Sequence, residues 1–134
     1  MITHPIADML IRIKNGQMAR LDRVTVPYSK MKAAVATILS QNNFVKDVER
    51  RTHKTKKSEF DYLDVGLHYG EGEGAISGLK IISKPSRHMY QKSSEIRVVR
   101  SGRGISVLTT PEGVMTSQEA RKKNIGGEIL FEIW

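Results

Sequence analysis

Two neighbouring threonines at a predicted turn carry the side chains of this sequence that best suit the chemistry of recognition. Thr109 and Thr110 are followed by Pro111, Glu112 and Gly113, so two hydroxyls and a glycine lie where a ligand can approach closely. Hydroxyls donate and accept hydrogen bonds, which suits ribose 2′-hydroxyls and base edges in the shallow minor groove of RNA. The alternative is turn chemistry alone, with Pro111 and Gly113 shaping a type I turn that the threonines cap.

A group of cations precedes this turn and surrounds a single aromatic ring, that of Tyr90. Between positions 80 and 103 these cations are opposed only by Glu95; they are Lys80, Lys84, Arg87, Lys92, Arg97, Arg100 and Arg103. Such a mixture fits phosphate contacts together with one ring that stacks on a base or ribose. The alternative is an ordinary solvated basic face with Tyr90 in the core.

Two further basic groups lie in the first half of the chain. Ser29 and Lys30 begin a predicted helix whose amino end suits a phosphate, although capping and solvation are sufficient to explain them. The stretch from Arg50 to Lys57 falls in a predicted connection between strands, where solvation already accounts for the charge. We therefore interpret this stretch as auxiliary to binding.

The sequence shows no recognisable pattern for catalysis or metal binding. The absence of cysteine excludes disulfides, thiolate metal sites and a cysteine nucleophile. The four histidines are far apart, no glycine-rich nucleotide loop is present, and Asp61 and Asp64 have no partnering base. We therefore expect no enzyme, no cofactor and no metal ion. An RNA-processing enzyme and a DNA regulator are the alternatives, and the second needs a helix-turn-helix pattern that is not evident.

The chain as a whole is small and basic. Its 134 residues include 22 Lys or Arg and 14 Asp or Glu, and the resulting formal net charge of +8 attracts phosphate polymers. Hydrophobic residues make up 39%, which is sufficient for one compact unit or two small lobes. No apolar run is long enough for a signal peptide or a membrane span, so we expect a cytoplasmic protein without a membrane partner.

Apolar spacing in the first half predicts two helices and three strands. The first helix has an apolar face from Ile6 to Ile13 and closes near Gly16, and the second begins at Ser29 and ends at Asn42. Strands are predicted at residues 23–26, 44–50 and 59–69, the last with a bulge between Tyr62 and Leu63. Glycines between positions 70 and 78 mark a boundary between an N-terminal lobe (1–74) and a C-terminal lobe (75–134).

The second half predicts mostly strands with one short helix. Residues Thr116 to Glu119 form a capping box at its start, and Asn124 provides the left-handed stop. Extended segments are expected at residues 79–83, 87–91, 105–110 and 128–134, with a short helix or turn at 94–100. The predicted fold class is therefore α+β, with two small α/β lobes packed together.

Three passages resemble the small-subunit ribosomal protein eight family. They are His4-Pro5-Ile6-Ala7-Asp8-Met9-Leu10 with the residues that follow it, Ser83-Lys84-Pro85, and the end of the chain from Gly104 to Trp134. In the last passage the family's order and spacing are matched by Thr109 to Thr116, by Glu119-Ala120-Arg121 and by Gly126-Gly127-Glu128-Ile129. The resemblance covers essentially the whole chain.

The resemblance implies a structural constituent of the small ribosomal subunit that supports subunit assembly. Its C-terminal lobe is expected to bind a helix in the central domain of the small-subunit ribosomal RNA. The other implied partners are neighbouring small-subunit ribosomal proteins and, as in some family members, the protein's own messenger RNA. The location implied is the ribosome, either cytoplasmic or organellar.

The resemblance also assigns the RNA-binding residues. The family's Ser-Thr-Ser-x-Gly turn corresponds to Thr109 through Gly113, where Pro111 removes a hydroxyl and Glu112 adds negative charge. Its Lys-Pro-Gly-Leu-x-x-Tyr passage corresponds to residues 84–90, with Ser86 in place of the glycine. The expected set is Lys84, Pro85, Ser86, Arg87, Tyr90, Thr109, Thr110, Pro111, Glu112, Gly113 and Glu128, with Ser29 and Lys30 added from the helix start.

Overall fold

The computed structural model describes residues 5–96 and 104–134, which form two compact units. The N-terminal unit comprises residues 5–75, and the C-terminal unit comprises residues 76–96 and 104–134. Both units contain antiparallel strands and at least one helix, which confirms the predicted α+β class. Within the described ranges no helix is long and apolar enough to cross a membrane.

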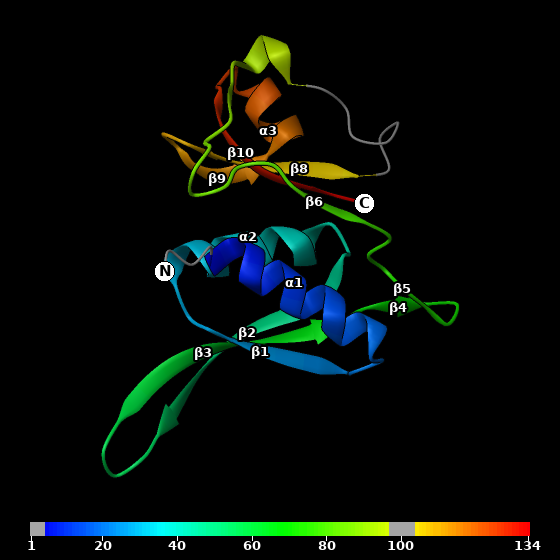
Figure 1. The fold of residues 1–134 in the computed structure, drawn as a ribbon, viewed down its shortest axis with the longest axis vertical. Helices are drawn as coiled ribbons and strands as arrows, with labels where there is room; N and C mark the ends of the chain where they lie inside the picture. The colour runs from blue at the N-terminus through cyan, green and yellow to red at the C-terminus, as the bar shows by residue number, and fades with distance from the viewer. Residues whose placement is uncertain (1–4, 97–103) are drawn as a thin grey trace. The chain divides into compact units, whose positions relative to one another are not determined.

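The N-terminal unit is a three-stranded antiparallel sheet with two helices on one face (Figure 1). Alternate residues such as Val24 and Val65 point toward the helices and are buried, because successive side chains of a strand alternate between its faces. Leu10 and Leu39 supply the helical side of this core. The strand order is β1-β3-β2, and the elements are α1 (Pro5–Met18), β1 (Arg23–Pro27), α2 (Lys30–Gln41), β2 (Val45–Lys54), β3 (Glu59–Leu67), β4 (Tyr69–Gly70) and β5 (Glu73–Gly74).

Helix α1 continues past its predicted end near Gly16, so that prediction is wrong. A Cβ atom on Gly16 would lie 2.5 Å from Cγ1 of Val24, so the absence of a side chain lets the helix approach β1 closely. The helix ends instead before Arg20, whose φ of 60° is left-handed, and the N–H of Leu21 donates to the carbonyl oxygen of Gly16 at 3.0 Å.

The β2–β3 hairpin is longer than predicted. Strand β2 continues to Lys54, so the connection predicted over residues 51–58 is only Thr55–Ser58. The bulge predicted between Tyr62 and Leu63 is also wrong, because the register shift lies in β2 between Val45 and Asp47. Strand β3 ends at Leu67, and the glycine-rich segment after it forms the short β4–β5 hairpin.

The C-terminal unit is an antiparallel sheet in the order β6-β10-β8-β9, with β7 also paired to β10. Its core contains Ile96, Leu108, Met115, Ala120 and Ile129, so α3 and the strands share one apolar cluster. The elements are β6 (Leu79–Ile81), β7 (Tyr90–Gln91), the 3-10 helix η1 (Ser93–Glu95), β8 (Ile105–Thr110), β9 (Gly113–Thr116), α3 (Ser117–Lys122) and β10 (Gly127–Ile133).

The N-cap of α3 and its left-handed stop agree with the sequence prediction, whereas the Glu119 carboxylate accepts from the Thr116 hydroxyl and not from a backbone N–H as the capping box predicted. Thr116 is the N-cap and its Oγ1 accepts from the N–H of Glu119 at 3.3 Å, while Asn124 has a left-handed φ of 57°. Strand β9, by contrast, was not predicted. The short helix or turn predicted at 94–100 corresponds in part to η1, and positions 97–100 lie outside the described residues.

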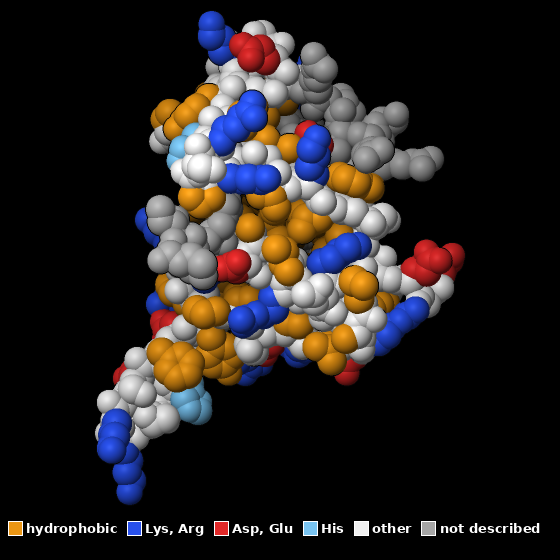
Figure 2. Space-filling view, viewed as in Figure 1, with side chains coloured by type: hydrophobic (Ala, Val, Ile, Leu, Met, Phe, Trp, Pro, Cys, Tyr) orange, Lys and Arg blue, Asp and Glu red, His pale blue; other side chains and the backbone are white. Residues whose placement is uncertain are grey.

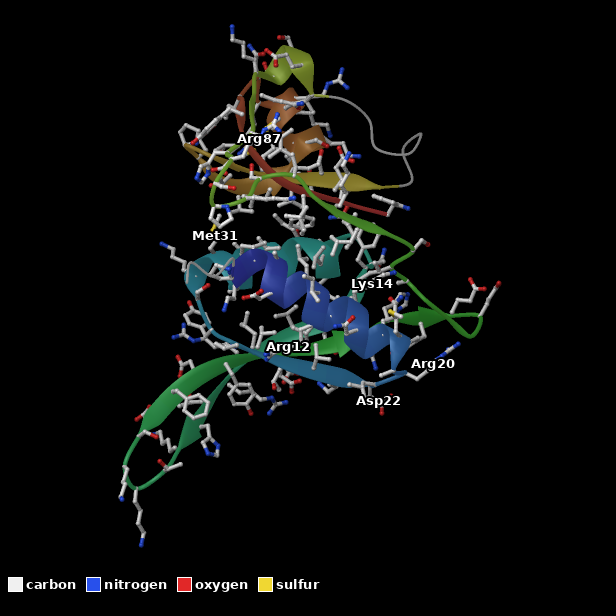
Figure 3. All side chains as sticks on the ribbon, in the orientation of Figure 1. Arg12, Lys14, Arg20, Asp22, Met31 and Arg87 are labelled. Atoms are coloured by element: carbon white, nitrogen blue, oxygen red, sulfur yellow. The ribbon has the colours of Figure 1, made fainter. Side chains whose placement is uncertain are left out.

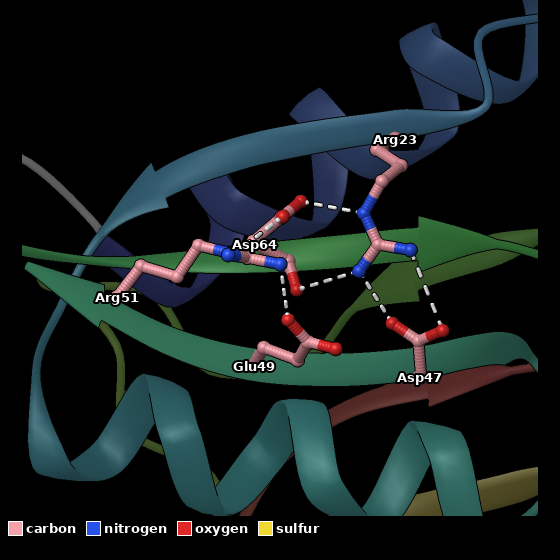
Figure 4. Close-up of polar contacts among 5 residues, drawn as sticks. All are labelled: Arg23, Asp47, Glu49, Arg51 and Asp64. Atoms are coloured by element: carbon pink, nitrogen blue, oxygen red, sulfur yellow. Dashed lines mark hydrogen bonds and ion pairs between the residues drawn. The ribbon is translucent and has the colours of Figure 1, made fainter.

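A network of ion pairs covers the face of the N-terminal sheet that the helices leave open (Figure 4). Arg23 lies 2.5 Å from Asp47 (Nη2 to Oδ1) and 2.8 Å from Asp64 (Nε to Oδ1). Arg51 lies 3.0 Å from the other Asp64 oxygen and also pairs with Glu49. The hydrogen bond from Arg23 lowers the pKa of Asp47 below its usual value of 3.8.

Replacing Asp47 with asparagine should lower the free energy of unfolding at neutral pH by up to about 1 kcal/mol, the range expected of an exposed ion pair. Because the pKa of Asp47 is lowered in the folded state, its contribution is complete above the usual value of 3.8 and is lost as the pH falls through the lowered pKa. Urea denaturation over this range should show the wild type and Asp47→Asn converging in acid. Asp22→Asn is the control, and a difference at Asp47 that persists in acid would contradict the assignment.

Candidate functional site

Three strands bring Tyr90, Glu128 and Thr109 into one row across the C-terminal sheet. Glu128 in β10 lies directly opposite Tyr90 in β7 on one side and directly opposite Thr109 in β8 on the other. Directly opposed residues in antiparallel strands place their side chains on the same face, with Cβ atoms about 5 Å apart. Three residues from the predicted set are therefore neighbours.

An open groove of about 820 Å³ lies along this row. Five of the predicted residues line it: Tyr90, Thr109, Thr110, Pro111 and Glu128. The lining residues outside the predicted set are Gln91, Lys92, Ser93, Glu95, Asn124, Gly126 and Gly127. The side chain of Tyr90 is 70% exposed, so the alternative that placed this ring in the core is wrong.

The two threonine hydroxyls differ in what they are free to bind. Thr110 Oγ1 donates to the carbonyl oxygen of Gly113 at 2.8 Å and accepts from the N–H of Glu112 at 3.2 Å, so it closes the turn between β8 and β9. Thr109 is half-buried, and its hydroxyl has no hydrogen-bond partner within the part of the chain that the structure describes. Turn chemistry therefore accounts for Thr110, whereas the Thr109 hydroxyl is not used within the described part of the chain.

Pro111, Glu112 and Gly113 form the exposed tip of the β8–β9 hairpin. Gly113 has a φ of 114°, a conformation that residues with a side chain rarely adopt. Pro111 lines the groove, while Glu112 and Gly113 do not. The tip thus contributes shape to one end of the groove and a negative charge beside it.

The carboxylate of Glu128 is held by a residue that the sequence did not single out. Nδ1 of His88 lies 2.7 Å from Oε2 of Glu128, and the side chain of Glu128 is only 15% exposed. A carboxylate oxygen bound in this way is fixed in direction, and the other oxygen remains able to accept a hydrogen bond. Glu128 is therefore a pre-oriented acceptor next to Tyr90.

Two glycines allow the strands beside the groove to lie close to one another. A Cβ atom on Gly126 would lie 2.4 Å from the carbonyl oxygen of Gln91, and one on Gly127 would lie 2.3 Å from that of Thr109. Either contact would force backbone to move, because real Cβ atoms do not approach so closely. The glycine pair is therefore required for the spacing of β7 and β8 about β10.

The predicted residues 84–87 form a tight turn before β7. The N–H of Lys84 donates to the carbonyl oxygen of Arg87, and the N–H of Arg87 donates back to Lys84, both at 2.9 Å. All four side chains of this turn, those of Lys84, Pro85, Ser86 and Arg87, are exposed, and none lines the groove. They lie next along the chain to His88.

Buried Ser83 attaches this turn to β10. Its hydroxyl donates to the carbonyl oxygen of Ile129 at 2.5 Å and accepts from the N–H of Met89 at 3.0 Å. The N–H of Ile129 in turn donates to the carbonyl oxygen of Met89 at 2.8 Å. Ser83 therefore reinforces the pairing that holds the segment from His88 to Tyr90 against β10.

Ser29 and Lys30 belong to the N-terminal unit and are not part of the groove. Ser29 is the N-cap of α2, and its hydroxyl accepts from the N–H of Lys32 at 3.1 Å. Capping therefore accounts for Ser29, and Lys30 is exposed. Among the described residues, no group of His, Asp and Glu side chains is arranged to hold a metal ion.

These features define a small, basic α+β protein that has an open groove lined in part by an exposed tyrosine ring. The description of the family whose model matches residues 4–134 is "Ribosomal protein S8". The chain is 43% identical over 134 residues to the small ribosomal subunit protein uS8 of Nitratidesulfovibrio vulgaris and 45% identical to that of Oleidesulfovibrio alaskensis, with the full length of each chain covered. It is 44% identical to the uS8 protein of Staphylococcus saprophyticus, covering 99% of this chain and 98% of the relative.

The chain belongs to the ribosomal protein S8 family. This confirms the family expected from the three passages of the sequence that resemble it. The family consists of structural proteins and not of enzymes, which agrees with the expected lack of catalytic activity.

Replacing Ser83 with alanine should destabilise the protein by about 1–3 kcal/mol, because one buried acceptor and one buried donor lose their partner. Ser86→Ala removes an exposed hydroxyl three residues away and should change stability by less than about 0.5 kcal/mol. Urea denaturation of the two variants measures the difference. Equal stabilities would show that Ser83 does not hold the turn to β10.

Proposed function

We propose that this chain is a structural component of the small ribosomal subunit and that its C-terminal lobe, residues 75–134, binds a helix in the central domain of the small-subunit ribosomal RNA. The observation that supports this proposal most directly is the row of Tyr90, Glu128 and Thr109 along one groove. These three side chains offer a flat exposed ring, an oriented acceptor and a free hydroxyl within one short span. Membership of the ribosomal protein S8 family supports the same partner.

Each side chain of the row suits a different part of an irregular RNA stem. The ring of Tyr90 stacks on a base or ribose that the helix leaves uncovered. The hydroxyl of Thr109 donates to or accepts from a ribose 2′-hydroxyl, a group that DNA lacks. The free oxygen of Glu128 accepts from a base amino group. Together these contacts recognise shape and sugar identity, which charge alone does not.

Cations near the groove supply the part of the affinity that does not depend on sequence. Lys92 lines the groove, and Lys84 and Arg87 are exposed on the turn before β7, where Figure 3 labels Arg87. Contacts of these side chains with phosphates release counterions, so binding weakens as salt increases. Lys30 at the start of α2 is a further phosphate contact in this proposal, with Ser29 beside it.

The relatives' names support the remaining partners. These relatives are small ribosomal subunit proteins of bacteria. We therefore place the chain in the cytoplasmic ribosomes of a bacterium, next to other small-subunit proteins. An organellar ribosome is the alternative location. An RNA stem of the same contour in the protein's own messenger RNA would fit the same groove.

Tyr90→Ala and Thr109→Val should each weaken binding of a fragment of the ribosomal RNA central domain. Loss of the ring should reduce affinity by about 5- to 100-fold, the usual effect of losing one base-stacking ring. Thr109→Val keeps the shape of the side chain and removes only the hydroxyl, so its smaller effect should disappear when the fragment carries 2′-deoxyriboses at the contacted positions. Fluorescence anisotropy at fixed salt measures both.

Lys84→Gln is the matched control for these two variants. It should weaken binding of the ribosomal fragment and of a random duplex of equal length to the same extent, because a phosphate contact does not depend on sequence. It should also reduce the slope of log K against log salt. Equal losses on both RNAs for Tyr90→Ala would reject the groove as the specific site.

A further inference from the structure

The β2–β3 hairpin carries aromatic rings on the sheet face that the helices leave open. His53 and Phe60 lie directly opposite each other in the two strands, with ring centroids 5.2 Å apart, and the ring of Tyr62 follows 6.5 Å from that of Phe60. Phe60 is 53% exposed although it is one of the largest apolar side chains in the protein. The hairpin therefore presents a cluster of mutually tilted rings on this face, with that of Phe60 exposed to solvent.

The cations of this hairpin fall into two groups that differ in their partners. Near the base, Arg50 pairs with Asp61 at 2.5 Å and lies over the ring of Tyr28, 3.8 Å from its centroid. Arg51 is likewise paired within the ion-pair network. The positive charges at the base are thus neutralised within the unit.

At the tip, Lys54, Lys56 and Lys57 are exposed and have no ion pair with any residue that the structure describes. Figure 2 shows Lys or Arg side chains at the end of the hairpin, with hydrophobic and histidine side chains next to them. The single acidic residue of the segment 54–60 is Glu59. Cations without partners and exposed rings therefore occupy the same end of one hairpin.

We propose that the β2–β3 hairpin is a second RNA contact, separate from the groove, at which an unpaired base stacks on Phe60 while Lys56 and Lys57 contact the adjoining phosphates. Every base has a flat face, so stacking on exposed rings binds single-stranded segments with little sequence preference. The lysines beside the rings favour a polyanion over a protein partner, since the centres of protein interfaces are depleted of lysine. This contact goes beyond the groove and does not depend on it.

Edge protection is the simpler explanation for part of this surface. Strand β2 lies at the edge of the sheet, where lysine discourages pairing with a second chain. It accounts for Lys54, which is paired to Glu59 in the register of the hairpin. It does not account for Lys56 and Lys57, which lie in the connection beyond the paired residues, or for the exposure of Phe60.

Binding of the full-length protein to a single-stranded RNA of about twelve nucleotides tests the contact, since single-strand sites of this kind span about 4–16 nucleotides. Phe60→Ala should weaken this probe about tenfold, as loss of one stacking ring does, and should leave a fully paired duplex of equal length unchanged. Phe60→Trp retains a flat ring and should retain the affinity. Thermal unfolding monitored by circular dichroism should show that the alanine variant is folded.

A charge-matched pair of double variants separates the tip from general electrostatics. Lys56→Gln with Lys57→Gln should reduce the slope of log K against log salt for the single strand by about 1.4, the value expected for two lost phosphate contacts. Lys122→Gln with Lys123→Gln removes the same charge at the end of α3 and should change this slope much less. Equal changes in the two double variants would overturn the assignment of the lysines.

Comparison with the groove variant Tyr90→Ala shows whether a negative result contradicts the hairpin contact or the groove assignment. Tyr90→Ala should weaken the ribosomal stem and spare the single strand, whereas Phe60→Ala should do the opposite. If Phe60→Ala leaves the single strand unaffected, the hairpin contact is wrong whether or not the groove binds the stem. If Tyr90→Ala leaves the stem unaffected, the groove assignment is wrong and the hairpin result stands.

Discussion

The backbone pairing of β10 with β6, β7 and β8 holds together residues from distant parts of the second half of the chain. Because Glu128 is opposed by a residue on each side, one strand determines the spacing between a ring from β7 and a hydroxyl from β8. Gly126 and Gly127 allow this spacing, since a side chain at either position would collide with neighbouring backbone. The row of side chains along the groove is thus a consequence of strand pairing.

Features that depend on local chemistry were predictable from the sequence, whereas features that depend on packing were not. The caps of α2 and α3 at Ser29 and Thr116 follow from residue types within one helical turn. The close approach of α1 to β1 at Gly16 depends on packing against Val24, which no local pattern contains. The false bulge at Tyr62 arose because rings on an open sheet face produce the same alternation as rings in a core.

Five of the residues that line the groove were predicted from the sequence, but their arrangement was not. Hydroxyls, a ring and the family resemblance drew attention to Thr109, Thr110 and Tyr90. Only the structure distinguishes Thr109 from Thr110, because the hydroxyl of the second is used within its own turn. His88 and Glu128 are 40 positions apart in the sequence, so the residues adjacent to either one do not indicate that the two side chains are in contact. Cross-strand relations of this kind require a register, which periodicity alone does not supply.

The ion pairs of the N-terminal unit have a consequence for how a charged partner arrives. On this sheet face the positive charges of Arg23 and Arg51 are balanced by the carboxylates paired with them. Their electric fields largely cancel at a distance, so the face attracts a distant charged partner only weakly. The lysines at the hairpin end have no acidic partner among the described residues, so their positive field is not cancelled in this way. The hairpin end therefore attracts a polyanion more strongly than the ion-paired sheet face does. Neutralisation within the sheet face thus leaves the attraction for polyanions to the cations that have no acidic partner.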